Sequence, residues 1–284
     1  MRAADALERA ALRLAAAGVE GARPDAELLL RHVRGWDAAG LILGMREALP
    51  DDDRAAFEEL VAARARRVPL QHLTGEQAFW RHVFRVTPDV LIPRPETEIL
   101  VEAALEAVRG VAAPRIVDVG TGSGCIALSL AAERPDATVH AVDLSPAALA
   151  VARDNARRLG LADRVRFHEG DLLAPVAAEP RFDLVVSNPP YVGEGEIPSL
   201  APEVRDHEPR MALTPPGERA SMYGRLASAA AAHLAPAGAL IVEIGSGMTE
   251  EVVQALSGAQ LSVRRVLPDL QGIDRILVAA RMQR

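Results

Sequence analysis

The chain has 284 residues, a formal net charge of −7 at pH 7, and 49% hydrophobic but only 3% aromatic residues. It contains no lysine, which excludes a Walker-type phosphate lysine, a Schiff base and a serine–lysine dyad. The acidic balance argues against a general affinity for nucleic acid. One cysteine excludes an internal disulfide, no histidine has metal-ligand spacing, and no apolar run is long enough to span a bilayer. We expect a cytoplasmic protein without metal or membrane binding.

Residues 1–74 are expected to form a small helical domain. Apolar residues recur at helical spacing, as at Leu7 and Leu14. Pro24 suits the start of a helix, Gly35 suits a helix end, and the acidic run at 51–53 suits the positive end of the next helix. No group of catalytic residue types occurs in this part.

Residues 75–95 are expected to link this domain to the rest as a β-hairpin. The stretch contains the β-prone residues Phe79, Trp80 and Phe84, and we expect the turn at residues 87–89. Prolines at positions 93 and 95 end it, and a helix follows.

In residues 96–284 short apolar strands alternate with helices of about a dozen residues. Strands are expected at 115–120, 138–143, 164–169, 182–188, 239–245, 261–267 and 274–280. This alternation predicts an α/β fold with a doubly wound, mostly parallel, seven-stranded sheet. Ligands of such sheets bind beyond the carboxyl ends of the strands, so the site is expected there.

A glycine-rich loop follows the first strand, in "DVGTGSGCIALSLA". Its five residues, Gly120, Thr121, Gly122, Ser123 and Gly124, allow a tight turn and a close approach of a ligand to backbone amides. The G-x-G-x-G spacing lacks the third glycine of the dinucleotide fingerprint. The alternative is a purely structural strand-to-helix turn.

Acidic residues follow the next two strands. Asp143 is placed to accept hydrogen bonds from ribose hydroxyls, although it could instead cap the next helix. Asp171 is placed to accept from the exocyclic amine of an adenine, and Leu172 would flank the ring. With the glycine-rich loop, they predict a pocket for an adenosine-containing cofactor.

The fourth strand ends in Asn188-Pro189-Pro190-Tyr191. Both prolines lack an N–H, and each residue before a proline is held extended. The Asn188 side-chain oxygen and the Pro189 carbonyl therefore form a stiff pair of acceptors that suits a planar NH₂ group, and Tyr191 can cover that plane. This pattern predicts methyl transfer to such a nitrogen. The alternative is a proline turn that merely ends a strand.

At these residues the chain resembles the class I S-adenosylmethionine-dependent methyltransferases of the HemK/PrmC type. The resemblance is carried by "LIPRPETE", "DVGTGSGCIALSLA", "FDLVVSNPPYV" and "APEVRDHEP". It implies a Rossmann-like catalytic domain that methylates the glutamine of the GGQ motif in peptide chain release factors. Asn-Pro-Pro-Tyr is also found in enzymes that act on nucleobases, so methylation of an exocyclic amine in RNA or DNA is the alternative.

The resemblance also implies residue roles. The loop 120–124, Asp143, Asp171, Leu172 and Asn188 would bind S-adenosylmethionine. Asn188, Pro189 and Tyr191 would be catalytic, and these with Pro190 and Phe79 would bind the substrate. The helical domain would help to dock the release factor. Separately from the resemblance, we expect a monomer without direct nucleic-acid binding.

Overall fold

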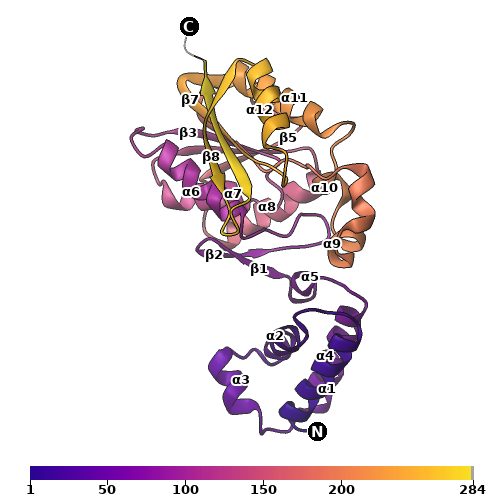
Figure 1. Cartoon of the computed structure of the whole chain (residues 1–284). Coiled ribbons are helices and arrows are strands. Elements are labelled where there is room, and N and C mark those ends of the chain that lie inside the picture. The colour runs from indigo at the N-terminus through magenta and orange to yellow at the C-terminus, as the bar shows by residue number, and fades with distance from the viewer. Residues whose placement is uncertain (283–284) are drawn as a thin grey trace. The chain divides into compact units, whose positions relative to one another are not determined.

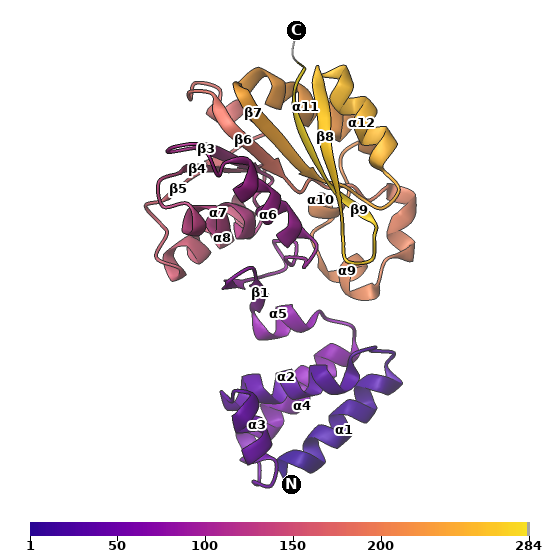
Figure 2. The same ribbon diagram turned by 60° about the vertical axis from the view of Figure 1, so that its left-hand side comes forward.

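The chain divides into two compact units in the computed structural model, which describes residues 1–282 (Figures 1 and 2). The helical unit comprises Met1–Glu76 and Leu200–His207, and the sheet unit comprises Gln77–Ser199 and Glu208–Arg284. Across the described residues, no helix has the length and apolar character that a membrane crossing requires.

The helical unit is held together by an apolar core that includes Leu7, Leu14, Leu29 and Phe57. The expected helix signals act at its ends: Gly35 adopts a left-handed φ of 64° after α2, and three aspartates occupy the first turn of α4. Its helices are α1 (Ala3–Ala16), α2 (Ala22–Arg34), α3 (Ala38–Gly44), α4 (Asp51–Ala65), α5 (Leu70–Thr74) and α9 (Pro202–His207).

Helix α9 belongs to the helical unit although it follows the unit's other helices by more than a hundred residues. Glu203 Oε1 accepts from Arg64 Nη1 at 2.8 Å and from Arg67 Nε at 2.6 Å, and Arg64 also donates to Asp25 at 2.7 Å. Burial raises the pKa of Glu203, but the bonds from Arg67 and Arg64 outweigh it and hold the pKa at about 2. The acidic stretch "EVRDHEP" is therefore partly an anchored segment.

A β-hairpin opens the sheet unit, formed by β1 (Glu76–Phe79) and β2 (His82–Arg85). The turn lies at Trp80 and Arg81, so the expected turn at 87–89 is wrong. Phe79 and Phe84 are both buried with ring centroids 6.0 Å apart, which a short turn between the two strands allows. Trp80 takes a φ of 55°, and its backbone N–H donates to Glu98 Oε1 at 2.8 Å.

The seven-stranded sheet has the order β5-β4-β3-β6-β7-β9-β8 and is parallel except for β9. The expected mostly parallel sheet of seven strands is confirmed. Its strands are β3 (Arg115–Val119), β4 (Thr138–Asp143), β5 (Val165–Glu169), β6 (Phe182–Ser187), β7 (Leu234–Glu243), β8 (Leu261–Pro268) and β9 (Asp274–Arg281). Because β6 returns to pair with β3, the strand order switches between these two strands.

Helices cover both faces of this sheet, and each face has its own apolar core (Figure 2). Helices α6, α7 and α8 pack on one face with the hairpin, and α11 and α12 pack on the other. The remaining elements of the unit are α6 (Thr97–Ala107), α7 (Cys125–Glu133), α8 (Pro146–Arg158), η1 (Ala174–Val176), η2 (Glu194–Ser199), α10 (Arg210–Leu213), α11 (Arg219–His233) and α12 (Thr249–Gly258).

Candidate active site

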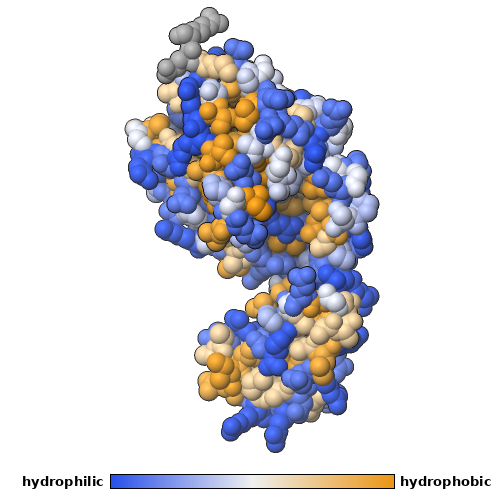
Figure 3. All heavy atoms as spheres, viewed as in Figure 1, coloured by the Kyte–Doolittle hydropathy of each residue, from blue (hydrophilic) through white to orange (hydrophobic). Residues whose placement is uncertain are grey.

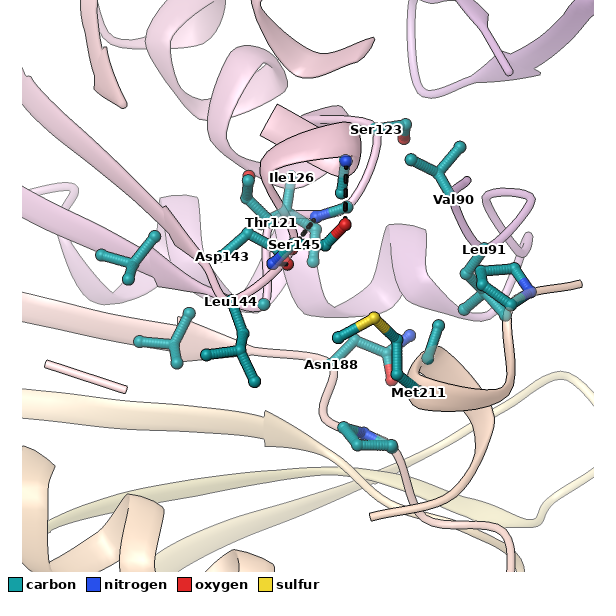
Figure 4. Close-up of a pocket in the computed structure, with 18 of the residues that line it drawn as sticks. Val90, Leu91, Thr121, Ser123, Ile126, Asp143, Leu144, Ser145, Asn188 and Met211 are labelled. Carbon is teal, nitrogen blue, oxygen red and sulfur yellow. Dashed lines mark hydrogen bonds between the residues drawn. The ribbon is translucent and has the colours of Figure 1, made fainter. Parts of the chain in front are cut away.

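A cavity of about 210 Å³ lies at the carboxyl ends of β3, β4 and β6, beside the switch in strand order. Its walls come from the glycine-rich loop, from the ends of β4 and β6, and from the segments before α6 and around α10. Figure 4 shows Thr121, Asp143 and Ser145 grouped together, with Asn188 and Met211 nearby. The site thus lies where parallel α/β sheets bind their ligands.

The glycine-rich loop takes a backbone conformation that suits glycine. Gly120, Gly122 and Gly124 have φ values of 75°, 55° and 83°. A Cβ at Gly124 would also lie 3.0 Å from Leu128 Cδ1, whereas Gly120 and Gly122 have no neighbour there within 4 Å. Thr121 and Ser123, which stand between these glycines, also line the cavity.

Asp118 supports the loop from within the sheet unit. Its Oδ2 accepts from Thr121 Oγ1 at 2.7 Å and from the Ala127 backbone N–H at 3.2 Å. Burial raises the pKa of Asp118 to about 7, and these two bonds oppose that rise. Asp118 was not among the residues expected at the site, although an acid inside the apolar strand "RIVDV" is a signal in the sequence.

Asp143 lines the cavity and braces the loop at the same time. Its Oδ2 accepts from the Gly122 N–H at 2.8 Å, and its Oδ1 accepts from the Ser145 N–H at 2.9 Å (Figure 4). Burial raises the pKa of Asp143, and the backbone bonds oppose the rise. Helix α8 is capped by Ser145, whose Oγ accepts from Ala148 N–H at 3.1 Å. The capping alternative for Asp143 therefore fails.

Asp171 and Leu172 lie at another part of the cavity wall. The Asp171 carboxylate is exposed and forms an ion pair with Arg225 of α11, which also lines the cavity. Leu172 has a φ of 50°, which is uncommon for a residue with a side chain. Arg225 was not expected from the sequence, because it lies more than fifty residues beyond Asp171.

The Asn188-Pro-Pro-Tyr corner is joined to the end of β3, since Ser187 Oγ donates to the Val119 carbonyl at 2.7 Å. Asn188 and Pro190 line the cavity. Pro189 is buried, and Tyr191 packs against the core on the α11 face. Burial raises the pKa of Tyr191 to about 12. The structure thus brings Asn188 and Pro190 to the cavity wall, whereas Pro189 and Tyr191 are not among the residues that line it.

Phe79 lies elsewhere. It is 1% exposed and belongs to the core on the α6 face, where it packs against Phe84. It is not among the residues that line the cavity. Its contact with the substrate stays a prediction, and in this structure the side chain packs in the core.

The segment before α6 also reaches the cavity, through Arg94 and Thr97. Arg94 Nη2 donates to Glu208 Oε1 at 2.6 Å, and burial raises the pKa of Glu208 while Arg94 opposes this rise. The ion pair holds "LIPRPETE" against the chain just before α10. Arg94 and Glu208 lie far apart in the sequence, so the sequence alone does not indicate that they pair.

Two protein families match separate parts of the chain: the PrmC N-terminal domain at residues 5–75 and the methyltransferase small domain at residues 95–218. A curated protein of Cereibacter sphaeroides named release factor glutamine methyltransferase is 49% identical over 284 residues, which cover 99% of each chain. The chain belongs to the release factor glutamine methyltransferase family.

Further members of this family show similar agreement along the whole length. The protein of that name from Deinococcus radiodurans is 44% identical over 285 residues, again covering 99% of each chain. The expected family is thereby confirmed, and the two-part organisation of the chain agrees with the two matching domains.

Solved structures agree in fold. The hMettl16 catalytic domain superposes with a TM-score of 0.57 at 15% identity, covering 79% of this chain and 83% of that one. A methyltransferase from Pyrococcus furiosus gives a TM-score of 0.51 at 18% identity, covering 69% and 87%. At these identities the likeness concerns the fold alone, and it confirms the Rossmann-like methyltransferase architecture.

Proposed function

We propose that this chain transfers a methyl group from S-adenosylmethionine to the side-chain amide nitrogen of the glutamine in the GGQ motif of peptide chain release factors. The observation that carries the proposal is one cavity lined by the glycine-rich loop, Asp143 and Asn188, in a chain that is 49% identical to a protein named for this activity.

The donor set fits S-adenosylmethionine, which would supply a methyl group on a sulfonium centre. Asp143 uses one lone-pair site of each oxygen on the Gly122 and Ser145 amides, so further sites remain for two hydroxyl groups of a ribose. Asp171 shares its Oδ2 with Arg225 and retains Oδ1 for an exocyclic amine. Leu172 supplies apolar surface beside it.

Asn188 and Pro189 would hold the substrate amide by its two N–H groups, with Pro190 and Tyr191 shaping the corner. An amide nitrogen is a weak nucleophile because its lone pair is delocalised. Fixing it in line with the reacting carbon can supply roughly 7–11 kcal/mol of the barrier. The two acceptors bind more strongly as the nitrogen gains positive charge, so they favour the transition state. The proton can leave after the methyl group arrives, and no strong base is needed.

The helical unit, with residues 1–74 as its main part, would dock the release factor. Ile42 and Leu43 of α3 are 74% and 78% exposed, and apolar surface is visible over α3 in Figure 3. Exposed apolar residues that lie together are typical of surfaces that bind other proteins. We further propose a monomer that acts in the cytoplasm, where release factors work and where a free, buried thiol such as Cys125 persists.

Mass spectrometry of an intact release factor tests this function. Incubation with the chain and S-adenosylmethionine should add the mass of one methyl group to the peptide that contains the GGQ glutamine. A release factor with that glutamine replaced by alanine should gain none. Labelling that survives this replacement, or methylation of bare RNA or DNA in place of the protein, would contradict the proposal.

A further inference from the structure

Three polar side chains from distant parts of the sheet unit form one hydrogen-bonded chain that starts at the cavity wall, which Asn188 and Thr97 both line, and ends at Glu243. Thr97 begins α6, Asn188 follows β6, and Glu243 ends β7. Thr97 Oγ1 donates to Glu243 Oε2 at 2.6 Å, and Asn188 Nδ2 donates to Thr97 Oγ1 at 3.2 Å. Thr97 and Glu243 are each 2% exposed, so the bond between them does not compete with bulk water.

The direction of these bonds follows from counting hydrogens. An ionised carboxylate can only accept, so the single hydroxyl hydrogen of Thr97 goes to Glu243. The Thr97 oxygen can then only accept from Asn188, and the Asn188 atom that faces it must be the NH₂ nitrogen. Asn188 Oδ1 is thereby left available to a group bound in the cavity.

Glu243 is held in place by the sheet and by α11. Ser187 and Val242 are register partners in β6 and β7, so Asn188 and Glu243 follow side by side. Tyr223 of α11 donates its hydroxyl to the Glu243 backbone carbonyl at 2.9 Å. A buried carboxylate is costly unless it is hydrogen-bonded, and the side-chain bond from Thr97 offsets part of this cost.

We propose that Thr97 and Glu243 are positioning residues that fix the amide of Asn188 with Oδ1 turned toward the substrate nitrogen. This inference rests on the proposed function, in which Asn188 accepts from the substrate amide. Without the Thr97 hydroxyl, the Asn188 amide could turn over and present its NH₂ group, which repels the substrate N–H groups. The two residues act through Asn188 and do not take part in bond making.

The test compares Thr97→Val, which removes the hydroxyl at nearly constant shape, with Thr97→Ser, which keeps it. Initial rates of release-factor methylation and calorimetric affinity for S-adenosylmethionine are measured for each. Thr97→Val should lower kcat by about 10–100-fold, by analogy with loss of the hydrogen-bond partner that orients a metal-binding side chain. Cofactor affinity should stay within about threefold of the parent protein, because orientation of an acceptor affects the reacting geometry most. Thr97→Ser should retain most of the rate.

Thr249→Val is the matched control. Its hydroxyl donates to Asp274 Oδ2 at 2.9 Å, the same kind of bond in the same unit, and Thr249 does not line the cavity. It should leave kcat unchanged. The inference is overturned if Thr97→Val keeps the parental kcat, or if Thr97→Ser loses as much as Thr97→Val. An unsubstituted protein that does not methylate the release-factor glutamine would instead overturn the proposed function.

Discussion

The Asp143 carboxylate lies 2.8 Å from the backbone nitrogen of Gly122, so the acid at the end of β4 and the loop after β3 are one structural unit. Each stabilises the other's conformation, and both line the same cavity. Loss of the carboxylate would therefore loosen the loop and also remove the proposed ribose contact.

Asp143→Ala is accordingly expected to weaken S-adenosylmethionine binding by at least about tenfold, because one lost hydrogen bond to a charged group corresponds to about 1.5–3 kcal/mol. Isothermal titration calorimetry measures the affinity of each variant for S-adenosylmethionine. Asp136→Ala is the control, since Asp136 also accepts from a backbone N–H, that of Ala113 at 2.9 Å, but does not line the cavity. Equal affinity in the Asp143 variant and the control would contradict the ribose role.

Asn188→Ala should reduce kcat strongly while cofactor affinity changes little. Loss of one preorganised transition-state hydrogen bond costs about 10²–10³-fold in rate, or roughly 2.7–4 kcal/mol. Single-turnover methylation of the release factor measures the rate, and calorimetry measures the affinity. A variant that loses cofactor affinity in proportion to its rate would instead assign Asn188 to cofactor binding alone.

The rate should depend on the ionisation of Glu243. Burial raises the pKa of Glu243 to about 7, opposed by the bond from Thr97; Glu96 adds to the rise, and Arg275 opposes it. Only the ionised carboxylate forces Thr97 to donate, so kcat should rise with pH through about 7.

Glu243→Gln checks this assignment, because glutamine has a similar shape and does not titrate. The variant should be slower overall, and the acid limb of its pH profile near neutrality should be gone. Tyr191, which also faces Glu243, has its pKa raised to about 12 and does not titrate in this range. Persistence of the same acid limb in the variant would mean that another group is responsible.

His140 should make the sheet unit sensitive to acid. It is 0% exposed, its Nδ1 lies 3.0 Å from His168 Nε2, and burial lowers its pKa to about 4, with His168 lowering it further and Glu179 opposing. Above the unfolded pKa of about 6.5 this histidine is neutral in both states and has no effect. As the pH falls from there to about 4, only the unfolded chain takes up the proton, so the free energy of unfolding decreases by roughly 3 kcal/mol in total.

Urea unfolding at neutral and acid pH measures this loss. Trp80 reports on the sheet unit when Trp36 of the helical unit is replaced by phenylalanine. In that background His140→Phe should lose less stability on acidification than the parent, whereas His32→Phe, which removes an exposed histidine of α2, should follow the parent. Identical acid dependence of the His140 variant and the parent would rule out the assignment.

The local features of the site could be predicted from the sequence. The glycines of the loop after β3 are required by left-handed φ values, and the Asn-Pro-Pro-Tyr corner restricts its own backbone. Both depend on neighbouring residues alone. The alternation of short apolar segments with helices likewise predicted the parallel strands, because a strand that is buried on both faces consists of a short apolar run.

The hairpin turn is the local feature that the sequence pattern predicted wrongly. β-prone residues stand on both sides of Trp80 and Arg81 as well as before residues 87–89, so the pattern does not locate the turn, whereas burial of Phe79 with Phe84 requires it between them. The same burial takes Phe79 away from the cavity. Whether an aromatic residue such as Phe79 is in the core depends on which face of the sheet the helices and the hairpin cover.

By itself the sequence determined the strand and helix periodicity, the glycine-rich loop and the rigid Asn-Pro-Pro-Tyr corner, because these follow from backbone freedom and side-chain type over a few residues. Only the tertiary structure decided that Thr97 and Glu243 meet Asn188, that Asp171 pairs with Arg225, and that α9 is anchored to α4 through Glu203. These pairs join residues dozens to more than a hundred positions apart. Their contact depends on strand order and helix packing, in which the whole core takes part.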